Sequence, residues 1–417
     1  MFILLAMAKN KYDNLIALGL AVIFSSFAFF SCSDSSSVRG IESERLFSLD
    51  YGKFDSQIDL FSISSIGSIN TFLAMRDGFF YIANGESQKI MEMNSYGDLL
   101  TLFFNEESGL VPDLELSEDS VDTTRKAISY PFNILGPIAV DSQKTVYVVD
   151  SLPLEQQVFG TDENLLFRQV VLRFSSDGKV LDYIGQQGVG GTPFPYIKKI
   201  YATENDELVV VCLTNEGMRV YWFDSQGHLL YVVPIRDSEM PNPFADQSAT
   251  PMHLSAENVI PSSDEHILFI KVDYFALSVD QDSKVQSGIE YTNTLLYPFY
   301  VVYGSYGEPL KIPPYEEDVS DGFGKVTYMT PYEFSGVTKS GWKFFSLPVK
   351  DGYMLQIVQS GGQRILNRKI KMDNDNLLYY AFSISETGIV SALFAYPERA
   401  VVEWWRIDSL IENLNED

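Results

Sequence analysis

Short apolar strands separated by tight turns recur along this chain and constrain its fold more than any other feature. Residues 196–233 hold four of them in a row, at 197–202, 208–213, 218–223 and 228–233. Runs of this length that are rich in Val and aromatic residues and bounded by turn residues are typical of β-strands. Four strands in about 40 residues is the size of one repeat of a β-propeller.

The same punctuation returns elsewhere in the chain. A Ser-x-Gly turn follows a strand at five places, and a more apolar strand precedes each of these strands. Glycine suits a tight hairpin because it adopts a positive φ without steric cost, and Ser can bond to the backbone at the start of a turn. The five turns lie at 95–97, 176–178, 225–227, 305–307 and 360–362, and the apolar strands before them lie at 79–84, 145–150, 207–212, 266–271 and 342–347.

A sixth pair of strands, at 388–396 and 400–405, lacks the Ser-x-Gly turn. Six pairs predict an all-β fold: a six-bladed β-propeller of four-stranded antiparallel blades over residues 45–408. The last blade, within 376–408, offers only three strands. A ring closes when an N-terminal strand completes the last blade and removes its unpaired edge. We therefore predict that a strand from 45–64 does so.

Several segments do not fit the blade pattern. Residues 409–417 are expected to form a C-terminal tail with a helical turn or two, and no second domain is expected. Two acidic stretches are predicted as long loops, and two others as insertions within blades. The loops are 105–129 and 313–325, and the insertions are 152–167 and 279–293.

The N-terminus has the pattern of an export signal. Lys9 and Lys11 precede an apolar run of 16 residues at 15–30, with Met1 and Met7 as alternative starts. A membrane-spanning helix needs ~20 apolar residues, whereas a signal-peptide core is shorter. The run ends at Phe29-Phe30-Ser31-Cys32.

Those four residues resemble the lipobox of bacterial lipoproteins, in which the Cys is acylated and becomes the mature N-terminus. Phe29 and Phe30 depart from the usual Leu and small residue, a departure found among spirochaete lipoproteins. The resemblance implies a signal peptide at 1–31, a lipid on Cys32, a flexible Ser-rich tether at 32–44 and attachment to the cell or outer membrane after export. A cleaved secretory signal and an uncleaved anchor are the alternatives.

Two stretches resemble the NHL repeat, whose pattern is a Pro, a short strand ending in Asp, a turn, and a strand ending in Asp-Ser. They are GPIAVDSQKTVYVVDS at 136–151 and VLRFSSDGKVL at 171–181. Proteins with this repeat form six-bladed propellers, which agrees with the count of strand pairs. The chain is thus similar to NHL-type propellers and to the propeller lipoproteins of spirochaetes. Such a repeat specifies a scaffold and no particular chemistry.

Charge excludes one class of partner. The 417 residues include 56 acidic and 30 basic side chains, for a formal net charge of −26. Nucleic-acid binding needs a basic surface, so no nucleic-acid partner is expected. The two cysteines, Cys32 and Cys212, are not expected to pair, because Cys212 lies in an apolar strand where a free Cys packs as a small hydrophobe.

No catalytic constellation is present, and the sequence predicts no catalytic residue. His228, His253 and His266 each lie beside a strand end, and no HExxH or G-x-S-x-G motif occurs. A calcium site at the central pore is the one metal hypothesis, because hard cations prefer oxygen ligands. Its candidates are Asn84, Asp141 and Asp150, although an ordinary turn residue or strand terminator is the favoured interpretation of each.

These observations favour a non-enzymatic function. Aromatic clusters at 221–223, 297–303 and 404–405 are expected in the core, while exposed ones would form a binding surface. We predict a lipid-anchored cell-envelope scaffold or assembly factor that binds an envelope protein and needs no cofactor. The alternatives are a calcium-dependent lactonase- or hydrolase-like enzyme and a carbohydrate- or peptide-binding module. A pore lined by apolar residues would exclude both small-molecule alternatives.

Overall fold

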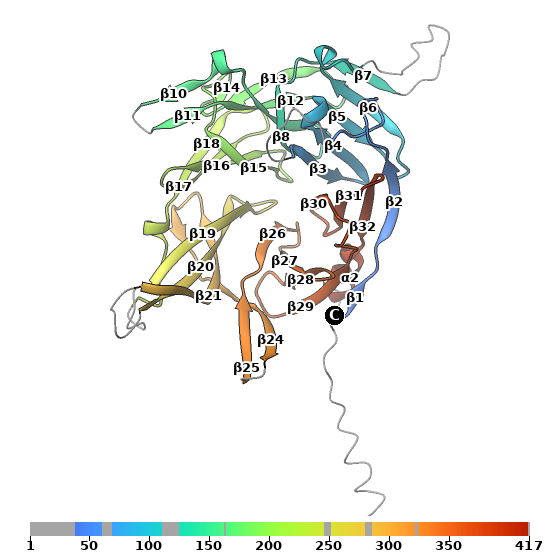
Figure 1. The fold of residues 1–417 in the computed structure, drawn as a ribbon. Coiled ribbons are helices and arrows are strands. Elements are labelled where there is room, and N and C mark those ends of the chain that lie inside the picture. The colour runs from blue at the N-terminus through green and yellow to red at the C-terminus, as the bar shows by residue number, and fades with distance from the viewer. Residues whose placement is uncertain are drawn as a thin grey trace, which may run out of the picture. The chain divides into compact units, whose positions relative to one another are not determined.

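The computed structural model describes residues 38–60, 69–110, 125–161, 164–245, 252–279, 286–321 and 324–415 (Figure 1). The predicted signal peptide and Cys32 lie outside these ranges. From Gly40 onward the chain forms one compact unit of β-sheets. Six sheets of four or five strands are arranged as the predicted six-bladed β-propeller. None of the described helices is both long enough and apolar enough to cross a bilayer.

The first three blades follow one another along the chain, each with its first strand at the centre of the ring. Blade one adds a fifth strand parallel to its rim, and blade two adds a two-residue strand. Blade one contains β3 (Thr71–Arg76), β4 (Phe79–Asn84), β5 (Lys89–Met93), β6 (Leu99–Phe104) and β7 (Lys126–Ser129); blade two contains β8 (Ile134–Val140), β9 (Val146–Ser151), β12 (Gln169–Phe174), β13 (Val180–Gly185) and β14 (Gly188–Val189); blade three contains β15 (Tyr196–Ala202), β16 (Leu208–Thr214), β17 (Gly217–Phe223) and β18 (Leu229–Ile235).

The last three blades repeat this arrangement with longer strands in blade four. The chain then ends in the helix α2 (Ile407–Asn415). Blade four contains β19 (Met252–Pro261), β20 (Ile267–Val279), β21 (Gln286–Tyr300), β22 (Ser305–Tyr306) and β23 (Leu310–Ile312); blade five contains β26 (Glu333–Val337), β27 (Lys343–Val349), β28 (Gly352–Val358) and β29 (Ile365–Lys371); blade six contains β30 (Tyr379–Ile384), β31 (Val390–Ala395) and β32 (Ala400–Trp405).

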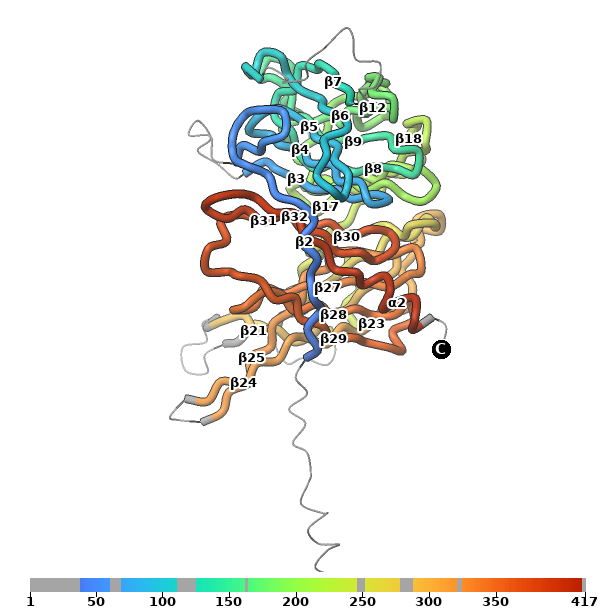
Figure 2. The backbone as a smooth tube through the Cα atoms, turned by 90° about the vertical axis from the view of Figure 1, so that its right-hand side faces the viewer, coloured from blue at the N-terminus to red at the C-terminus, as the bar shows by residue number. Residues whose placement is uncertain are grey.

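An N-terminal strand closes the ring, as predicted. β2 (Glu44–Leu49) pairs antiparallel with β32 and becomes the fourth strand of blade six. Figure 2 shows β2 in blue alongside β32 in red. Just before it, β1 (Gly40–Ile41), in a stretch that the sequence assigned to the tether, pairs in parallel with β29 of blade five. The start of the described chain therefore holds blades five and six together.

The apolar core lies between the blades. Six clusters of buried side chains each draw on two neighbouring blades, including the pair formed by blades six and one. In that pair Phe47 of β2 meets Phe80 of β4 edge to face, with ring centroids 5.6 Å apart. Each blade is thus an apolar layer that both neighbours cover, which explains why its central strands are apolar on both faces.

Seven hairpin turns in the described chain share one construction. The first turn residue accepts a hydrogen bond through its side chain from the backbone N–H four residues later, and the residue before that donor has a positive φ. In three of the predicted Ser-x-Gly turns, at 95–97, 176–178 and 225–227, the acceptor is the residue before the Ser, for instance Asp224, while Gly227 has φ 86°. The accepting residues are Asn94, Asp141, Ser175, Thr203, Asp224, Thr338 and Ser385.

One predicted turn was wrong. The strand predicted up to residue 304 ends at Tyr300, the turn spans residues 301–304, and Ser305–Tyr306 is the strand β22. Gly304 takes the positive φ there, at 61°, and Gly307 does not. The apolar residues that follow Tyr300 imitated a continuing strand: Val302 and Tyr303 are exposed in the turn.

The predicted loops and insertions contain more strand than expected. The acidic stretch 313–325 is not a loop: it contributes β24 (Tyr315–Asp321), which pairs with β25 (Gly324–Thr330) as a hairpin. The insertion at 152–167 contains a second hairpin, β10 (Val158–Gly160) with β11 (Leu165–Phe167). The predicted loop 105–129 ends in β7, and its residues 111–124 lie outside the described chain. Acidic composition hid the alternation of apolar residues in β24–β25.

Candidate functional site

A channel of about 420 Å³ runs between the first strands of all six blades. Its wall combines apolar side chains, such as Ile260 and Phe382, with charged and hydroxyl-bearing ones. Because the pore is not purely apolar, the condition that would have excluded small-molecule binding is not met. The volume falls within the ~300–1,000 Å³ typical of ligand pockets.

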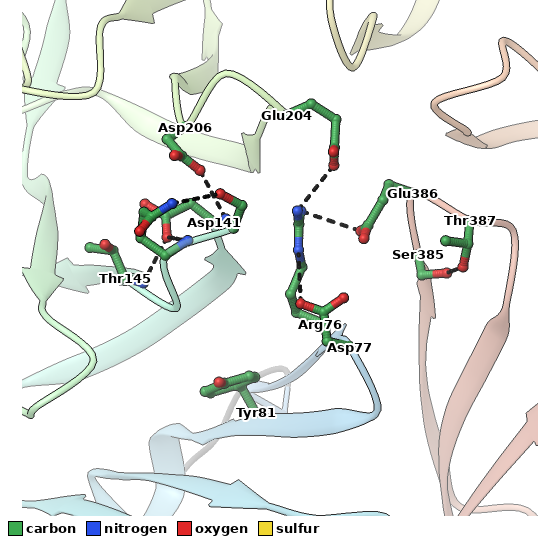
Figure 3. Close-up of polar contacts among 12 residues, drawn as sticks. Arg76, Asp77, Tyr81, Asp141, Thr145, Glu204, Asp206, Ser385, Glu386 and Thr387 are labelled. Carbon is green, nitrogen blue, oxygen red and sulfur yellow. Dashed lines mark hydrogen bonds and ion pairs between the residues drawn. The ribbon is translucent and has the colours of Figure 1, made fainter.

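One mouth of the channel is organised by Arg76, the last residue of β3 (Figure 3). Its guanidinium lies 3.0 Å from Glu204 of blade three, 3.3 Å from Glu386 of blade six and 3.9 Å from Asp77 beside it. The Arg76 side chain is only 8% exposed. A single arginine therefore links three blades across the ring.

The charge at this mouth is unbalanced, because one guanidinium faces three carboxylates. Burial raises the pKa of Glu386, and Arg76 opposes that shift. The Nε atom of Arg76 has no hydrogen-bond partner among the described residues. We call this set of four residues the Arg76 mouth; its excess negative charge favours cations over anions at that end.

Asp141, a calcium candidate, lies in the neighbouring turn and is already saturated. Its Oδ1 accepts hydrogen bonds from the N–H groups of Gln143 and Thr145, and its Oδ2 accepts one from Tyr147 at 3.1 Å. Burial raises the pKa of Asp141. Asp206 supports the same turn by accepting from the Ser142 N–H (Figure 3). Asp141 thus acts as a turn residue.

Asn84 and Asp150 lie at the ends of β4 and β9, in different blades from one another. The Asn84 amide donates to Thr71 and to the carbonyl of Asp59. Asp150 accepts from the N–H groups of Asn133 and Ile134, and burial raises its pKa to about 6. The structure does not bring the three calcium candidates together, and the described residues contain no group of three His, Cys, Asp or Glu side chains suited to a metal.

The channel also contains two opposite charges that sequence reasoning missed. Lys199 of β15 and Glu333 of β26 both line it, and both side chains are accessible to water there. Within the described chain neither side chain makes a hydrogen bond or ion pair. Burial lowers the pKa of Lys199, an effect that the nearby Glu333 opposes. β15 has a bulge beside Lys199 and β26 has one beside Glu333, and the sequence gives no sign of either bulge.

The histidines and Cys212 are occupied elsewhere. His266 lies 3.1 Å from Glu207 and stacks edge-on against Trp222, and His228 pairs with Asp224 in its turn. His253 lies on β19 near Phe275. Cys212 is free and fully buried, and burial raises its pKa. The predicted packing of Cys212 as a small hydrophobe is confirmed.

A second candidate site is the hairpin β24–β25, which extends from the join between blades four and five (Figure 1). Val319 pairs directly with Val326, and Tyr328 follows two residues later on the same face. Their exposed fractions are 42%, 47% and 57%. The opposite face carries more polar side chains: Asp318 lies 2.7 Å from Lys325, and Met329, 45% exposed, is its apolar exception.

Most side chains of the predicted aromatic clusters lie in the core, and a few are exposed. Tyr221, Trp222, Phe223 and Trp405 are buried. Tyr303 is 80% exposed at the turn after β21. Tyr303 and Tyr300, which is 38% exposed, line one surface pocket together with Asn205, Asp264 and His266.

Comparisons with known proteins give no family. No family model matches the chain, and no curated protein matches it. Similar solved structures include the hydrazine synthase of Kuenenia stuttgartiensis (11% identity, 78% of this chain and 76% of that chain, TM-score 0.39) and a gluconolactonase of Xanthomonas campestris (10% identity, 88% and 96%, TM-score 0.39). A streptogramin B lyase is 12% identical over 83% of this chain and 96% of that chain, with a TM-score of 0.34. At these levels the comparisons assign no activity, and the propeller is shown by the chain's own sheet topology.

Proposed function

We propose that this protein is a lipid-anchored scaffold of the cell envelope that binds a protein partner through the apolar face of the β24–β25 hairpin. The observation that supports this most is the row formed by Val319, Val326 and Tyr328, which no described part of the propeller covers. An isolated two-stranded hairpin is marginally stable in water. A partner that covers this face would stabilise it.

The charges beside the apolar row indicate the partner's chemistry. The described part of the hairpin carries one base, Lys325, and four acids, which gives a net charge of −3; the acids are Glu316, Glu317, Asp318 and Asp321, and Glu317 pairs directly with Tyr328. Like charges across an interface are costly, whereas complementary ones direct association. The partner surface should therefore be apolar with a basic margin.

The anchoring part of the proposal depends on the lipobox-like residues that end at Cys32. These residues and the NHL resemblance remain predictions. The fold supports them in one respect: the propeller begins at β1, a few residues after the Ser-rich stretch, so a tether of this kind would precede the first strand directly.

A triple substitution of the hairpin face should abolish partner binding. With Val319→Ser, Val326→Ser and Tyr328→Ser, the propeller should keep its melting temperature, because these side chains are exposed. The amount of a protein that co-purifies stoichiometrically with the native chain in mild detergent should be at least tenfold lower with the variant. The reason is that residues at the centre of an interface carry most of the binding energy. Quantitative mass spectrometry of the pull-down measures this.

The matched control changes the other face of the same hairpin, through Lys325→Gln and Thr327→Ser. This variant should retain the partner, apart from a weak dependence on salt. Equal recovery of every co-purifying protein with both variants would show that the hairpin face is not the binding surface.

Cys32→Ala should abolish fatty-acid incorporation. If Cys32 carries the lipid, cells fed radiolabelled palmitate should label the native protein, and the variant should lose the label and move from the detergent phase to the aqueous phase. Cys212→Ala is the control, because that thiol is buried in blade three and should not be acylated. Labelling that survives Cys32→Ala would overturn the anchor.

A further inference from the structure

Lys199 and Glu333 line the same channel and carry opposite charges, but they do not form an ion pair with each other. They come from blades three and five, and each is accessible to water inside the ring. The Lys199 ammonium and the Glu333 carboxylate lie near enough to influence each other electrostatically, yet no contact of 4 Å or less joins them. Because both charges are accessible to water, a ligand that displaced this water would have to pair with them to offset the cost of desolvation.

No other described charge forms an ion pair with either residue. Lys198, next in sequence, donates from Nζ to the backbone carbonyl of Glu257, and it also lies near enough to Glu333 for the two charges to interact. Lys271 is paired with Asp273 in the buried layer of blade four. The Arg76 mouth holds its own carboxylates beyond the ends of the inner strands: Glu204 lies in the turn after β15, five positions after Lys199.

The walls around the pair are suited to an organic solute. Tyr353 and Phe382 meet edge to face with centroids 4.9 Å apart, and Tyr380, 44% exposed, lies on the same wall. The site thus offers a positively charged hydrogen-bond donor, a negatively charged hydrogen-bond acceptor and an aromatic surface.

We infer that the channel binds a small zwitterion, an amino acid or a peptide of a few residues, with its carboxylate on Lys199 and its ammonium on Glu333. Such a ligand would pair both unsatisfied charges at once, whereas a simple anion or cation would pair only one. A primary ammonium gives Glu333 up to three donors, and a carboxylate accepts readily from Lys199. This site is independent of the hairpin, and its failure would leave the proposed scaffold function untouched.

Isothermal titration calorimetry on the full propeller tests the inference. The probes are the free amino acids, followed by diglycine and triglycine, which distinguish an amino acid from a short peptide. The affinity of the tightest binder should fall about tenfold or more when its amine is acetylated or its carboxylate is converted to the amide, as expected for charged hydrogen bonds. Lys199→Gln and Glu333→Gln should each cause a similar loss.

Each substitution should remove the same contact as one of the two ligand derivatives. Lys199→Gln should not weaken the amide derivative further, and Glu333→Gln should not weaken the acetylated derivative further, because the contact is already gone. Lys325→Gln, on the distant hairpin face, should leave binding unchanged. Absence of binding by every probe, or binding that both channel substitutions leave intact, would overturn the inference.

Discussion

A chain that begins at residue 51 should fail to form a cooperative propeller, whereas a chain that begins at residue 33 should fold. The shorter chain lacks β2, so β32 becomes an unpaired edge and blade six loses its fourth strand. It also loses Phe47 and Leu49, which are 8% and 3% exposed between blades six and one. The ring would be open at the interface where its two ends meet.

The expected size of this effect follows from those two side chains. Removing a buried Phe to Ala costs about 3–5 kcal/mol and a buried Leu about 2–5 kcal/mol. The free energy of unfolding of a protein is only about 5–15 kcal/mol. The loss of both side chains, together with the hydrogen bonds of β2, therefore removes most of this free energy. Circular dichroism melting measures the outcome, and Phe47→Ala should give an intermediate loss. A 51–417 chain that melts cooperatively within a few degrees of the 33–417 chain would contradict closure by β2.

Arg76→Met should destabilise the propeller by about 2 kcal/mol at pH 7. Removing one partner of a buried ion pair costs about 3–5 kcal/mol, and the figure is reduced here because Glu204, Glu386 and Asp77 are 31%, 17% and 57% exposed. The substitution leaves three carboxylates from blades one, three and six facing one another. Urea unfolding at fixed pH measures the change.

The loss should shrink as the pH falls from 7 to 5. Burial already raises the pKa of Glu386 in the native protein, and Arg76 lowers it, so the variant should raise it further. A carboxyl whose folded pKa exceeds its unfolded value binds protons more tightly in the folded state, so protonation favours folding as the pH falls. Arg45→Met is the control: Arg45 is 65% exposed and, among the described residues, forms an ion pair with Glu403 alone, so this substitution should leave the free energy of unfolding nearly unchanged. A deficit for Arg76→Met that is equal at both pH values would show that carboxylate repulsion is not its cause.

The fold could be predicted because its signals are local. Apolar strands and glycine turns repeat with each blade, and the missing strand of blade six pointed to closure by the N-terminus, which β2 provides. The hairpin β24–β25 was missed because four acidic residues in 313–325 outweighed the alternation of Val319, Val326 and Tyr328. There the acidic composition predicted a loop, whereas the alternation of apolar residues indicates strands, and the structure contains strands.

The candidate sites could not be predicted in the same way, because they depend on distance in space. Asp141 and Asp150 look like metal ligands in sequence, yet each is saturated by backbone N–H groups of its own blade. Lys199 and Glu333 lie 134 positions apart, and only the ring places them in one channel. Arg76 likewise meets Glu386 only because blade one closes against blade six.

Site-specific photo-crosslinking at position 328 tests the central claim most directly. A photoreactive phenylalanine analogue replaces Tyr328 on the apolar face of the hairpin, and a second chain carries it at Tyr96, which is 85% exposed on a turn of blade one. In native cells, position 328 should yield one dominant crosslinked protein whose contact surface is apolar with basic residues at its margin, and position 96 should not. Crosslinks of equal pattern and yield at both positions, or none at position 328, would contradict a scaffold that binds its partner through β24–β25.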